Sequence, residues 1–510
     1  MMRLISVKSA TISFAALTTS LIQKRSHALA TSASKMPPLL SERNMSEHMD
    51  LAQKAIKYFD SSPDPFHAVQ TSIDRLSALG FTELKESEPF QDKIERGGKY
   101  YYSRNKSTIV AFTVGNKFEP GNGFKVIGGH TDSPNLKVKP HSKRSSSGCT
   151  QLAVECYGGG LWHTWFDRDL GISGRVFVRN VDGRVEQKLV RINRPILRIP
   201  NLAIHLTTAS EREAFAINKE DHLTPILATE AKKALTGKDD DSEGWKSRQE
   251  PLLLEMIANE LNVEVESICD FELNLFDVQT ASLGGAYSEF IHSARLDNLA
   301  SCFLAIEGLA EHSQAELDDD EDISLVALFD HEEVGSSSQS GAGSPVMGEA
   351  VKRISAALCD GEKDEDLYAA CIQKSFVLSV DQAHAIHPNY ASKHEKGHAP
   401  KMNAGMVIKR NSNQRYATNA VTGFLVKEIA EKAGLPPVQE FVVRNDCGCG
   451  STIGPIISSS TGIRAIDMGC PQLSMHSIRE TMGVADLTNG LTLFKAYFKY
   501  FRDVDSSLEQ

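Results

Sequence analysis

Histidines and carboxylates capable of metal chemistry recur directly after short apolar runs in this chain. His130 and Asp132 follow the apolar residues 124–127, with two glycines in front. Five loops carry such groups, and the other members are Asp297, Glu332, Glu333, Asp381, His384 and His476. A lone histidine in a turn is ordinarily structural, and an aspartate before a helix is ordinarily an N-cap. Carboxylates gathered in one cleft repel one another, however, and need a cation between them.

Two histidines and three carboxylates suit two borderline metal ions such as zinc, cobalt or manganese, provided that one carboxylate bridges. A pair of such ions can activate water and polarise a substrate carbonyl. A further acidic group beside the ions could act as general base. The adjacent Glu332 and Glu333 offer this division of labour, one as ligand and one as base. Asp132 fits a carboxylate that accepts the remaining N–H of His130 and orients its ring.

The elements that must position these groups alternate between strands and helices. Helices are expected from an N-cap at Ser46 and over residues 66–79, 298–309 and 419–433. Apolar strands are expected over residues 108–114, 124–127, 322–330, 375–381 and 462–469. This alternation predicts an α/β fold with a mainly parallel sheet covered by helices. Such sheets bind ligands at the carboxyl ends of their strands.

A β-rich domain is predicted to interrupt this pattern at residues 139–280. It begins with a polar linker at 141–148 and continues with short alternating strands and a polar insert at 235–250, which is expected to be disordered. The catalytic domain is then divided into residues 46–138 and 281–510. The acidic run at 316–324 is expected to be a solvated loop.

The first 45 residues are predicted to be a leader. Residues 1–41 contain no Asp or Glu but contain basic residues and many Ser, Thr and Ala, which is typical of a transit peptide to a plastid or mitochondrion. A flexible extension of a cytoplasmic protein and a secretory signal are the alternatives, and Met36 and Met45 offer internal starts.

Composition excludes several classes of protein. The net charge of −11 disfavours a nucleic-acid binder. No apolar run reaches the roughly 18 residues of a membrane span. The nine cysteines are scattered, so they form no disulfide framework and indicate a reducing compartment.

Six motifs in the same order resemble the M18 family of metallopeptidases, over residues 48–503. They are GGHTDSPNLKVKP, SARLDNLASC, DHEEVGSSSQSGA, VDQAHAIHPNY, KRNSNQRYATNA and CPQLSMHSIRE. The resemblance implies an α/β catalytic domain with an inserted β-rich dimerisation domain, and a homo-oligomer that is typically a dodecamer. His331, where the family usually has a smaller amide, and the pair Cys447-Gly448 depart from its pattern.

The resemblance also implies two Zn²⁺ ions per subunit, with Co²⁺ or Mn²⁺ as alternatives. His130, Asp297 and Asp381 would bind one ion. Asp297, Glu333 and His476 would bind the other, with Asp297 as the bridge.

For the substrate, the resemblance makes Glu332 the general base. It places Lys409 and Tyr416 near an acidic substrate side chain. His384 and His205 would contact the substrate, and His205 would come from the inserted domain of a neighbouring subunit.

The implied activity is removal of N-terminal Asp or Glu from peptides. A carboxypeptidase or deacylase with a similar metal set is the enzymatic alternative. A non-catalytic oligomeric scaffold or cargo protein is the other. No nucleic-acid or membrane partner is expected.

Overall fold

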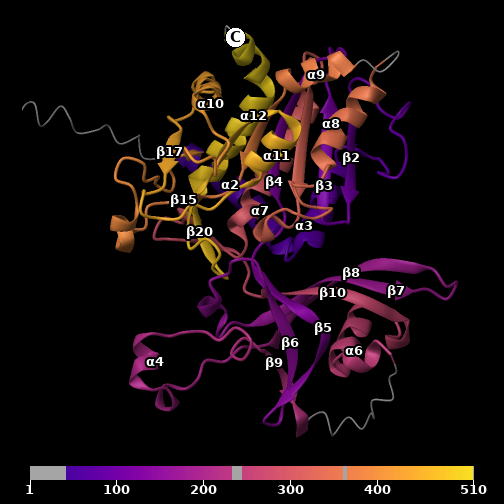
Figure 1. Ribbon diagram of the computed structural model, residues 1–510, viewed down its shortest axis with the longest axis vertical. Helices are drawn as coiled ribbons and strands as arrows, with labels where there is room; N and C mark the ends of the chain where they lie inside the picture. Colours follow the sequence, from indigo (N-terminus) through magenta and orange to yellow (C-terminus); the bar gives the residue numbers. More distant parts are fainter. Residues whose placement is uncertain (1–41, 232–243, 360–364, 509–510) are drawn as a thin grey trace, which may run out of the picture. The chain divides into compact units, whose positions relative to one another are not determined.

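The computed structural model describes residues 42–231, 244–359 and 365–508 (Figure 1). The predicted leader, apart from its last few residues, lies outside these ranges, as do residues 235–243 of the predicted polar insert. In the described part of the chain, no helix is long and apolar enough to cross a membrane.

A nine-stranded sheet forms the centre of the catalytic region, in the order β1-β2-β3-β13-β4-β14-β18-β16-β17. Its strands are β1 (Thr82–Glu83), β2 (Lys99–Arg104), β3 (Thr108–Val114), β4 (Phe124–His130), β13 (Ile323–Phe329), β14 (Phe376–Val380), β16 (Val407–Arg410), β17 (Gln439–Val442) and β18 (Arg464–Gly469). The four strands β13, β4, β14 and β18 are mutually parallel. The predicted mainly parallel sheet is therefore confirmed.

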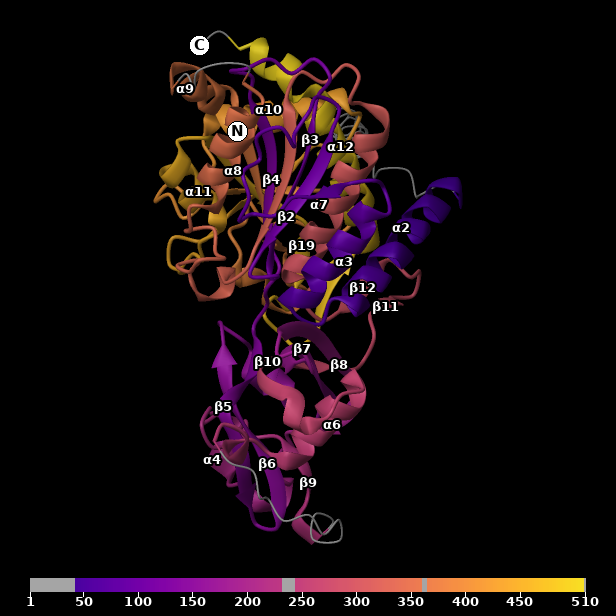
Figure 2. The ribbon, with the colours of Figure 1, turned by 90° about the vertical axis from the view of Figure 1, so that its right-hand side faces the viewer.

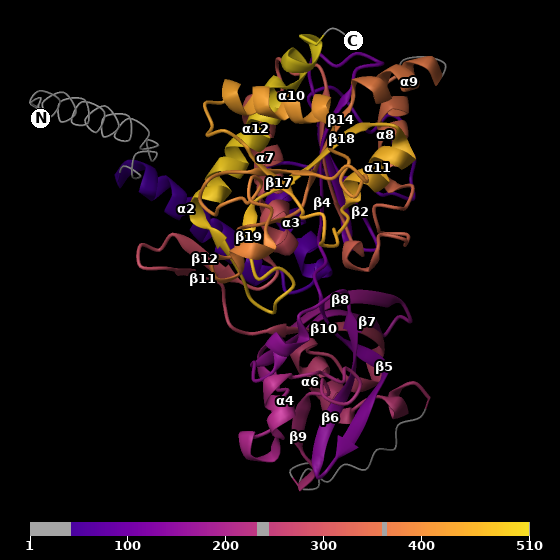
Figure 3. The same ribbon diagram turned by 60° about the vertical axis from the view of Figure 1, so that its left-hand side comes forward.

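Helices cover both faces of this sheet (Figures 2 and 3). They are α2 (Glu42–Ser61), α3 (Pro65–Ser77), α7 (Leu296–Ala315), α8 (Val346–Ala357), α9 (Glu365–Lys374), α10 (Ala420–Lys432), α11 (Ile453–Thr461) and α12 (Val484–Ser506). One apolar core lies under α3, α7, α10 and α12, and a second lies under α8 and α11. Burial on both faces explains why the central strands are mainly apolar.

Two helices begin at capping residues close to the starts predicted for them. Asp64 accepts the main-chain N–H of His67 and Asn419 accepts that of Thr422, so α3 and α10 begin close to the predicted residues. The predicted N-cap at Ser46 is wrong, because α2 already begins at Glu42.

The inserted region forms a separate antiparallel sheet in the order β8-β7-β10-β5-β6-β9. Its strands are β5 (Asn135–Ser146), β6 (Cys149–Tyr157), β7 (Leu170–Arg179), β8 (Val185–Leu197), β9 (Ile226–Thr229) and β10 (Ile268–Asp277). Helix α6 (Pro251–Leu261) contributes to its apolar core, and α4 (Ala209–Glu213) belongs to a long loop. The predicted linker at 141–148 is wrong. These residues end β5 and turn into β6 through Ser147 and Gly148, both with positive φ.

A small third sheet runs in the order β11-β12-β20-β19-β15. Its strands are β11 (Ser282–Gly284), β12 (Phe290–Ser293), β15 (Ala383–His384), β19 (Pro471–Leu473) and β20 (Glu480–Gly483). The loop between β19 and β20 carries His476, so this sheet positions one of the predicted ligands.

The acidic run at 316–324 is not a wholly solvated loop. Asp320 is buried against Lys125 at 2.7 Å and His312 at 2.8 Å. Asp322 is buried against Arg502 at 2.8 Å. The predicted solvated loop is therefore wrong for these two carboxylates, because each is buried and has a cationic or imidazole partner that offsets the cost of its desolvation.

Candidate metal centre

The ends of adjacent parallel strands bring the predicted ligands together. His130 is the last residue of β4 and pairs with Phe329, the last residue of β13, which leads into the loop of Glu332 and Glu333. Asp381 directly follows β14, the neighbour of β4 on its other side. Because carboxyl ends of parallel strands meet at one edge of a sheet, residues about 250 positions apart converge there.

Two groups of possible ligands form around one shared carboxylate. His130, Asp297 and Asp381 make one group, and Asp297, Glu333 and His476 make another, with ligand atoms within 4.8 Å of one another in each. A third group of the same kind, which lacks Asp297, consists of His130, Glu332 and Glu333. His130 Nε2 lies 3.4 Å from Asp297 Oδ1, whereas His476 Nε2 lies 3.5 Å from Asp297 Oδ2. Asp297 thus presents one oxygen to each of the two groups that share it, which is the arrangement of a bridging carboxylate.

The carboxylates of this centre suit a bound cation. Asp297 Oδ1, Glu333 Oε1 and Asp381 Oδ1 are buried without a hydrogen-bond partner among the described residues. A buried carboxylate oxygen without a partner is costly unless it is bound by a proton or a metal ion. Imidazole nitrogens and carboxylate oxygens together form a donor set that zinc accepts, so the residues fit the predicted metal pair.

Protonation equilibria show the same concentration of negative charge. Burial raises the pKa of Glu332 to about 7, and the Asp381 carboxylate adds to the effect. Burial and the Asp297 carboxylate raise the pKa of Glu333 well above its usual value. Burial opposes protonation of His476, yet Asp297 and Glu333 raise its pKa to about 10. Without metal ions, the negative charge of the clustered carboxylates favours protonation of these groups. Divalent cations bound between the carboxylates would offset that charge instead.

Glu332 and Glu333 lie in the 3₁₀ helix η5 (Glu332–Val334), which Asp132 holds in place. The Asp132 carboxylate accepts the main-chain N–H groups of Glu332 and Glu333, each at 3.1 Å. It also accepts the Tyr157 hydroxyl at 2.6 Å. The carboxylate lies 3.5 Å from His130 Nδ1, but the Asp132 main-chain carbonyl is nearer, at 3.0 Å. The ring of His130 is therefore oriented mainly by the carbonyl, and the carboxylate organises the glutamate loop.

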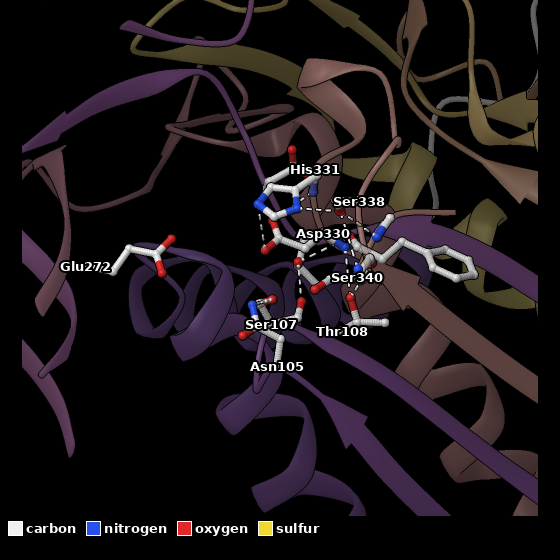
Figure 4. Close-up of polar contacts among 12 residues, drawn as sticks. Asn105, Ser107, Thr108, Glu272, Asp330, His331, Ser338 and Ser340 are labelled. Carbon is white, nitrogen blue, oxygen red and sulfur yellow. Dashed lines mark hydrogen bonds and ion pairs between the residues drawn. The ribbon is translucent and has the colours of Figure 1, made fainter. Parts of the chain in front are cut away.

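A polar network supports this loop from behind (Figure 4). The Asp330 main-chain N–H donates to Thr108 Oγ1 at 3.0 Å. His331 Nδ1 contacts Ser338 Oγ at 2.7 Å, and its ring lies 6.2 Å from that of Tyr157. His331 has a φ of 62°, and the Asp330 carboxylate accepts its main-chain N–H at 2.8 Å. The unusual histidine thus stabilises the sharp turn that aims the two glutamates.

The predicted substrate residues Lys409, Tyr416 and His384 lie beside the Asp381 end of the centre. Lys409 is only 3% exposed, and its ammonium donates to Asp381 Oδ2 at 3.1 Å and to the Gln382 carbonyl at 3.0 Å. The Tyr416 ring lies 5.3 Å from the same ammonium. His384 is accessible and packs edge-on against Phe441. Lys409 therefore has a structural partner in Asp381, and these two contacts use two of its three N–H donors.

His205 is in none of the ligand groups of the described residues. It lies in the 3₁₀ helix η2 (Ile204–Leu206) of the inserted region and is exposed. Its role as a substrate contact stays a prediction.

Three contributors to the centre were missed by the sequence analysis. Glu480 is buried and accepts the main-chain N–H groups of Asp297 at 2.9 Å and His476 at 2.8 Å. Tyr157 binds Asp132, and the carbonyl of Gly159 accepts a hydrogen bond from His476 Nδ1 at 3.1 Å. Three consecutive glycines after a strand, at 158–160, were the available signal for a close backbone approach.

The fold and this centre define an α/β protein with clustered metal-ligand side chains at the carboxyl edge of a mainly parallel sheet. Residues 58–498 match the family model described as aminopeptidase I zinc metalloprotease (M18). The chain therefore belongs to the M18 family of zinc aminopeptidases.

Relatives and solved structures agree with this assignment. The chain is 47% identical to a probable aspartyl aminopeptidase of Ricinus communis, over 92% of this chain and 99% of the relative. It is 47% identical to an aspartyl aminopeptidase of Aspergillus oryzae, over 89% and 96% respectively. A chain in the cryo-EM structure of the Ape4 and Nbr1 complex is 42% identical, with a TM-score of 0.88 over 92% of this chain and 90% of that one. A chain in the structure of the S. cerevisiae mApe1 dodecamer is 32% identical in sequence, with a TM-score of 0.81 over 91% of this chain and 100% of that one.

Proposed function

We propose that this chain is an aspartyl aminopeptidase that removes N-terminal Asp or Glu from peptides with two zinc ions per subunit. The observation that carries the proposal is the pair of ligand groups that share Asp297, with Glu332 beside them. Cobalt and manganese suit the same nitrogen and oxygen donors.

The protein groups divide the chemistry as follows. His130, Asp297 and Asp381 would hold one ion, and Asp297, Glu333 and His476 would hold the other. When bound, the ions supply the Lewis acidity that activates water and the scissile carbonyl. Glu332 accepts the proton of the attacking water at its carboxylate and passes it to the leaving amine.

Selectivity for acidic residues is assigned to Lys409, with Tyr416 and His384 beside it. The remaining N–H of the Lys409 ammonium would donate to the substrate's side-chain carboxylate. His384 has an exposed side chain beside Lys409, and partial desolvation of its ring together with the lysine charge lowers the pKa of the imidazole. A buried cation offsets the repulsion that a carboxylate-rich site would exert on an acidic substrate.

The inserted domain, residues 139–280, is assigned to dimerisation. Its loop around His205 exposes four large apolar side chains: Leu202 (59%), Ile204 (65%), Leu206 (71%) and Phe215 (54%). Apolar side chains grouped on a surface loop are typical of a protein interface. Covering this loop with a second subunit would bury them and bring His205 to a neighbouring active site. The dodecameric relative supports a dodecamer built from such dimers.

The leader, residues 1–45, is assigned to targeting, on its composition alone. A plastid or mitochondrial destination is proposed, with a cytoplasmic protein as the alternative. Fractionation of cells that express a full-length fluorescent fusion distinguishes the two.

The experiment that tests the activity uses the purified oligomer. Bound zinc is measured by elemental analysis, and cleavage of peptides with N-terminal Asp, Glu, Leu and Lys is followed with and without chelator. We expect two zinc ions per subunit and chelator-sensitive release of Asp and Glu. Release of the C-terminal residue or of an acyl group instead would show a different metallohydrolase. If the protein bound no zinc and showed no activity, the non-catalytic scaffold would be the remaining hypothesis.

A further inference from the structure

We propose that a segment of the inserted domain in the same subunit, residues 157–161, is a positioning element of the metal centre. This segment, here called the glycine segment, runs Tyr157-Gly158-Gly159-Gly160-Leu161 and leaves the inserted sheet at the end of β6. The inference rests on the proposed function, because it takes Glu333 and His476 as ligands and Glu332 as the base.

Tyr157 connects the inserted sheet to the glutamate loop through one carboxylate. Its hydroxyl donates to Asp132 Oδ2 at 2.6 Å, and the same carboxylate accepts the main-chain N–H groups of Glu332 and Glu333. The Tyr157 ring is fixed independently, with Lys137 Nζ 4.3 Å from its centroid. The hydroxyl can therefore be removed without removing the packing of the ring.

The rest of the glycine segment forms hydrogen bonds with the loop that carries His476. The Leu161 main-chain N–H donates to the His476 carbonyl at 2.9 Å. His476 Nδ1 donates to the Gly159 carbonyl at 3.1 Å, since a carbonyl can only accept. A donating Nδ1 leaves the lone pair of the neutral ring on Nε2, which faces Asp297 and Glu333. The carbonyl of Gly159 therefore orients the ring of His476 through Nδ1, just as the carbonyl of Asp132 orients the ring of His130.

Gly158 explains why the segment contains glycine. Its φ is 73°, and a Cβ atom there would lie 3.2 Å from Glu333 Cβ and 3.4 Å from the Glu333 carbonyl. A side chain at this position would press on the ligand loop. The inserted domain consequently contacts Glu333, His476 and Asp132 of its own subunit through this one segment.

The first test removes the Tyr157 hydroxyl. Metal-free Tyr157→Phe oligomer is titrated with zinc in competition with a chromophoric chelator. We expect a zinc affinity up to ~10-fold weaker than that of the wild type, the lower end of the range for removal of a ligand's direct partner, because Tyr157 acts on Glu333 only through Asp132. We also expect a lower kcat with little change in KM, because the base loop loosens but the substrate contacts remain. Tyr101→Phe is the matched control, since the Tyr101 hydroxyl accepts from Ser77 far from the ligands.

The second test separates pressure on the ligand from backbone strain. Gly158→Ala and Gly148→Ala place alanine at similar left-handed positions, with φ of 73° and 78°, but nothing lies within 4 Å of the new Cβ at 148. Both variants should show a similar fall in the melting temperature of the metal-free protein. Only Gly158→Ala should also weaken zinc binding.

The outcomes separate this inference from the proposed function. If the wild type binds zinc and cleaves Asp peptides while Tyr157→Phe and Gly158→Ala bind zinc normally, the positioning role is refuted and the activity stands. An equal loss of zinc affinity in the control variants would also refute it. If the wild type itself binds no zinc, the proposed function fails first.

Discussion

Replacing Lys409 by methionine tests how this protein selects acidic substrates. Met keeps most of the length and apolar character of the chain but removes the ammonium. A charge-assisted hydrogen bond contributes ~1.5–3 kcal/mol, which corresponds to a factor of ~10–150 in kcat/KM. That loss should appear for peptides with N-terminal Asp or Glu. Peptides with N-terminal Ala make no such contact and should not show it.

The structure adds a second effect that the assay must separate. The Lys409 ammonium also donates to Asp381 Oδ2 at 3.1 Å, and its charge holds the pKa of Asp381 well below the usual range despite burial. Loss of this contact disturbs a ligand whatever the substrate, so it lowers kcat/KM by one common factor. The ratio of the Asp to the Ala rate constants therefore isolates the contact with the substrate.

Both enzymes are assayed at saturating zinc with Asp-, Glu- and Ala-terminal peptides. Lys427→Met is the matched control, because Lys427 forms a surface ion pair with Glu440. An equal fall for all three peptides would show that Lys409 serves Asp381 alone, and the argument for acidic selectivity would be lost.

Four further predictions concern the base, the bridge, the assembly and stability. Glu332→Gln should lower turnover by ~10²–10⁴ with both metals retained; loss of zinc or wild-type turnover would contradict its role. Calorimetric titration should show that Asp297→Ala weakens both metal sites and Glu333→Ala mainly one, whereas loss of a single site in Asp297→Ala would argue against a bridge. Reassembled mixtures of His205→Ala and Glu332→Gln subunits should recover activity that neither parent has, and verified mixed oligomers without recovery would exclude a contribution in trans. Lys125 lowers the pKa of the Asp320 carboxyl from 3.8 to about 2, although burial alone would raise it. Ionised Asp320 therefore stabilises the fold above pH ~4, and this contribution is lost as the pH falls toward 2. Asp320→Asn should therefore cost about 2 kcal/mol at neutral pH in denaturant unfolding, and the difference should shrink in acid; a difference independent of pH would refute this account.

Local patterns predicted the elements of the catalytic region well, because each reflects a short-range constraint. Strand β3 occupies the predicted residues 108–114, and helices α3 and α10 begin within one residue of the predicted starts at 66 and 419. The failures also have local causes. The polar residues 141–148 read as a linker because a solvent-facing strand and its turn have the same composition.

The sequence by itself determined which side chains were available for chemistry, since histidines and carboxylates after apolar strands are visible in the order of residues. It also placed them at one edge of a sheet, because parallel strands present their carboxyl ends together. Only the tertiary structure decided which atoms meet. The two Asp297 oxygens face different groups, Lys409 pairs with Asp381, and Tyr157 and Gly159 reach the centre from the inserted sheet. Such contacts join segments far apart in the chain, and their geometry depends on the packing of whole sheets, which no local pattern encodes.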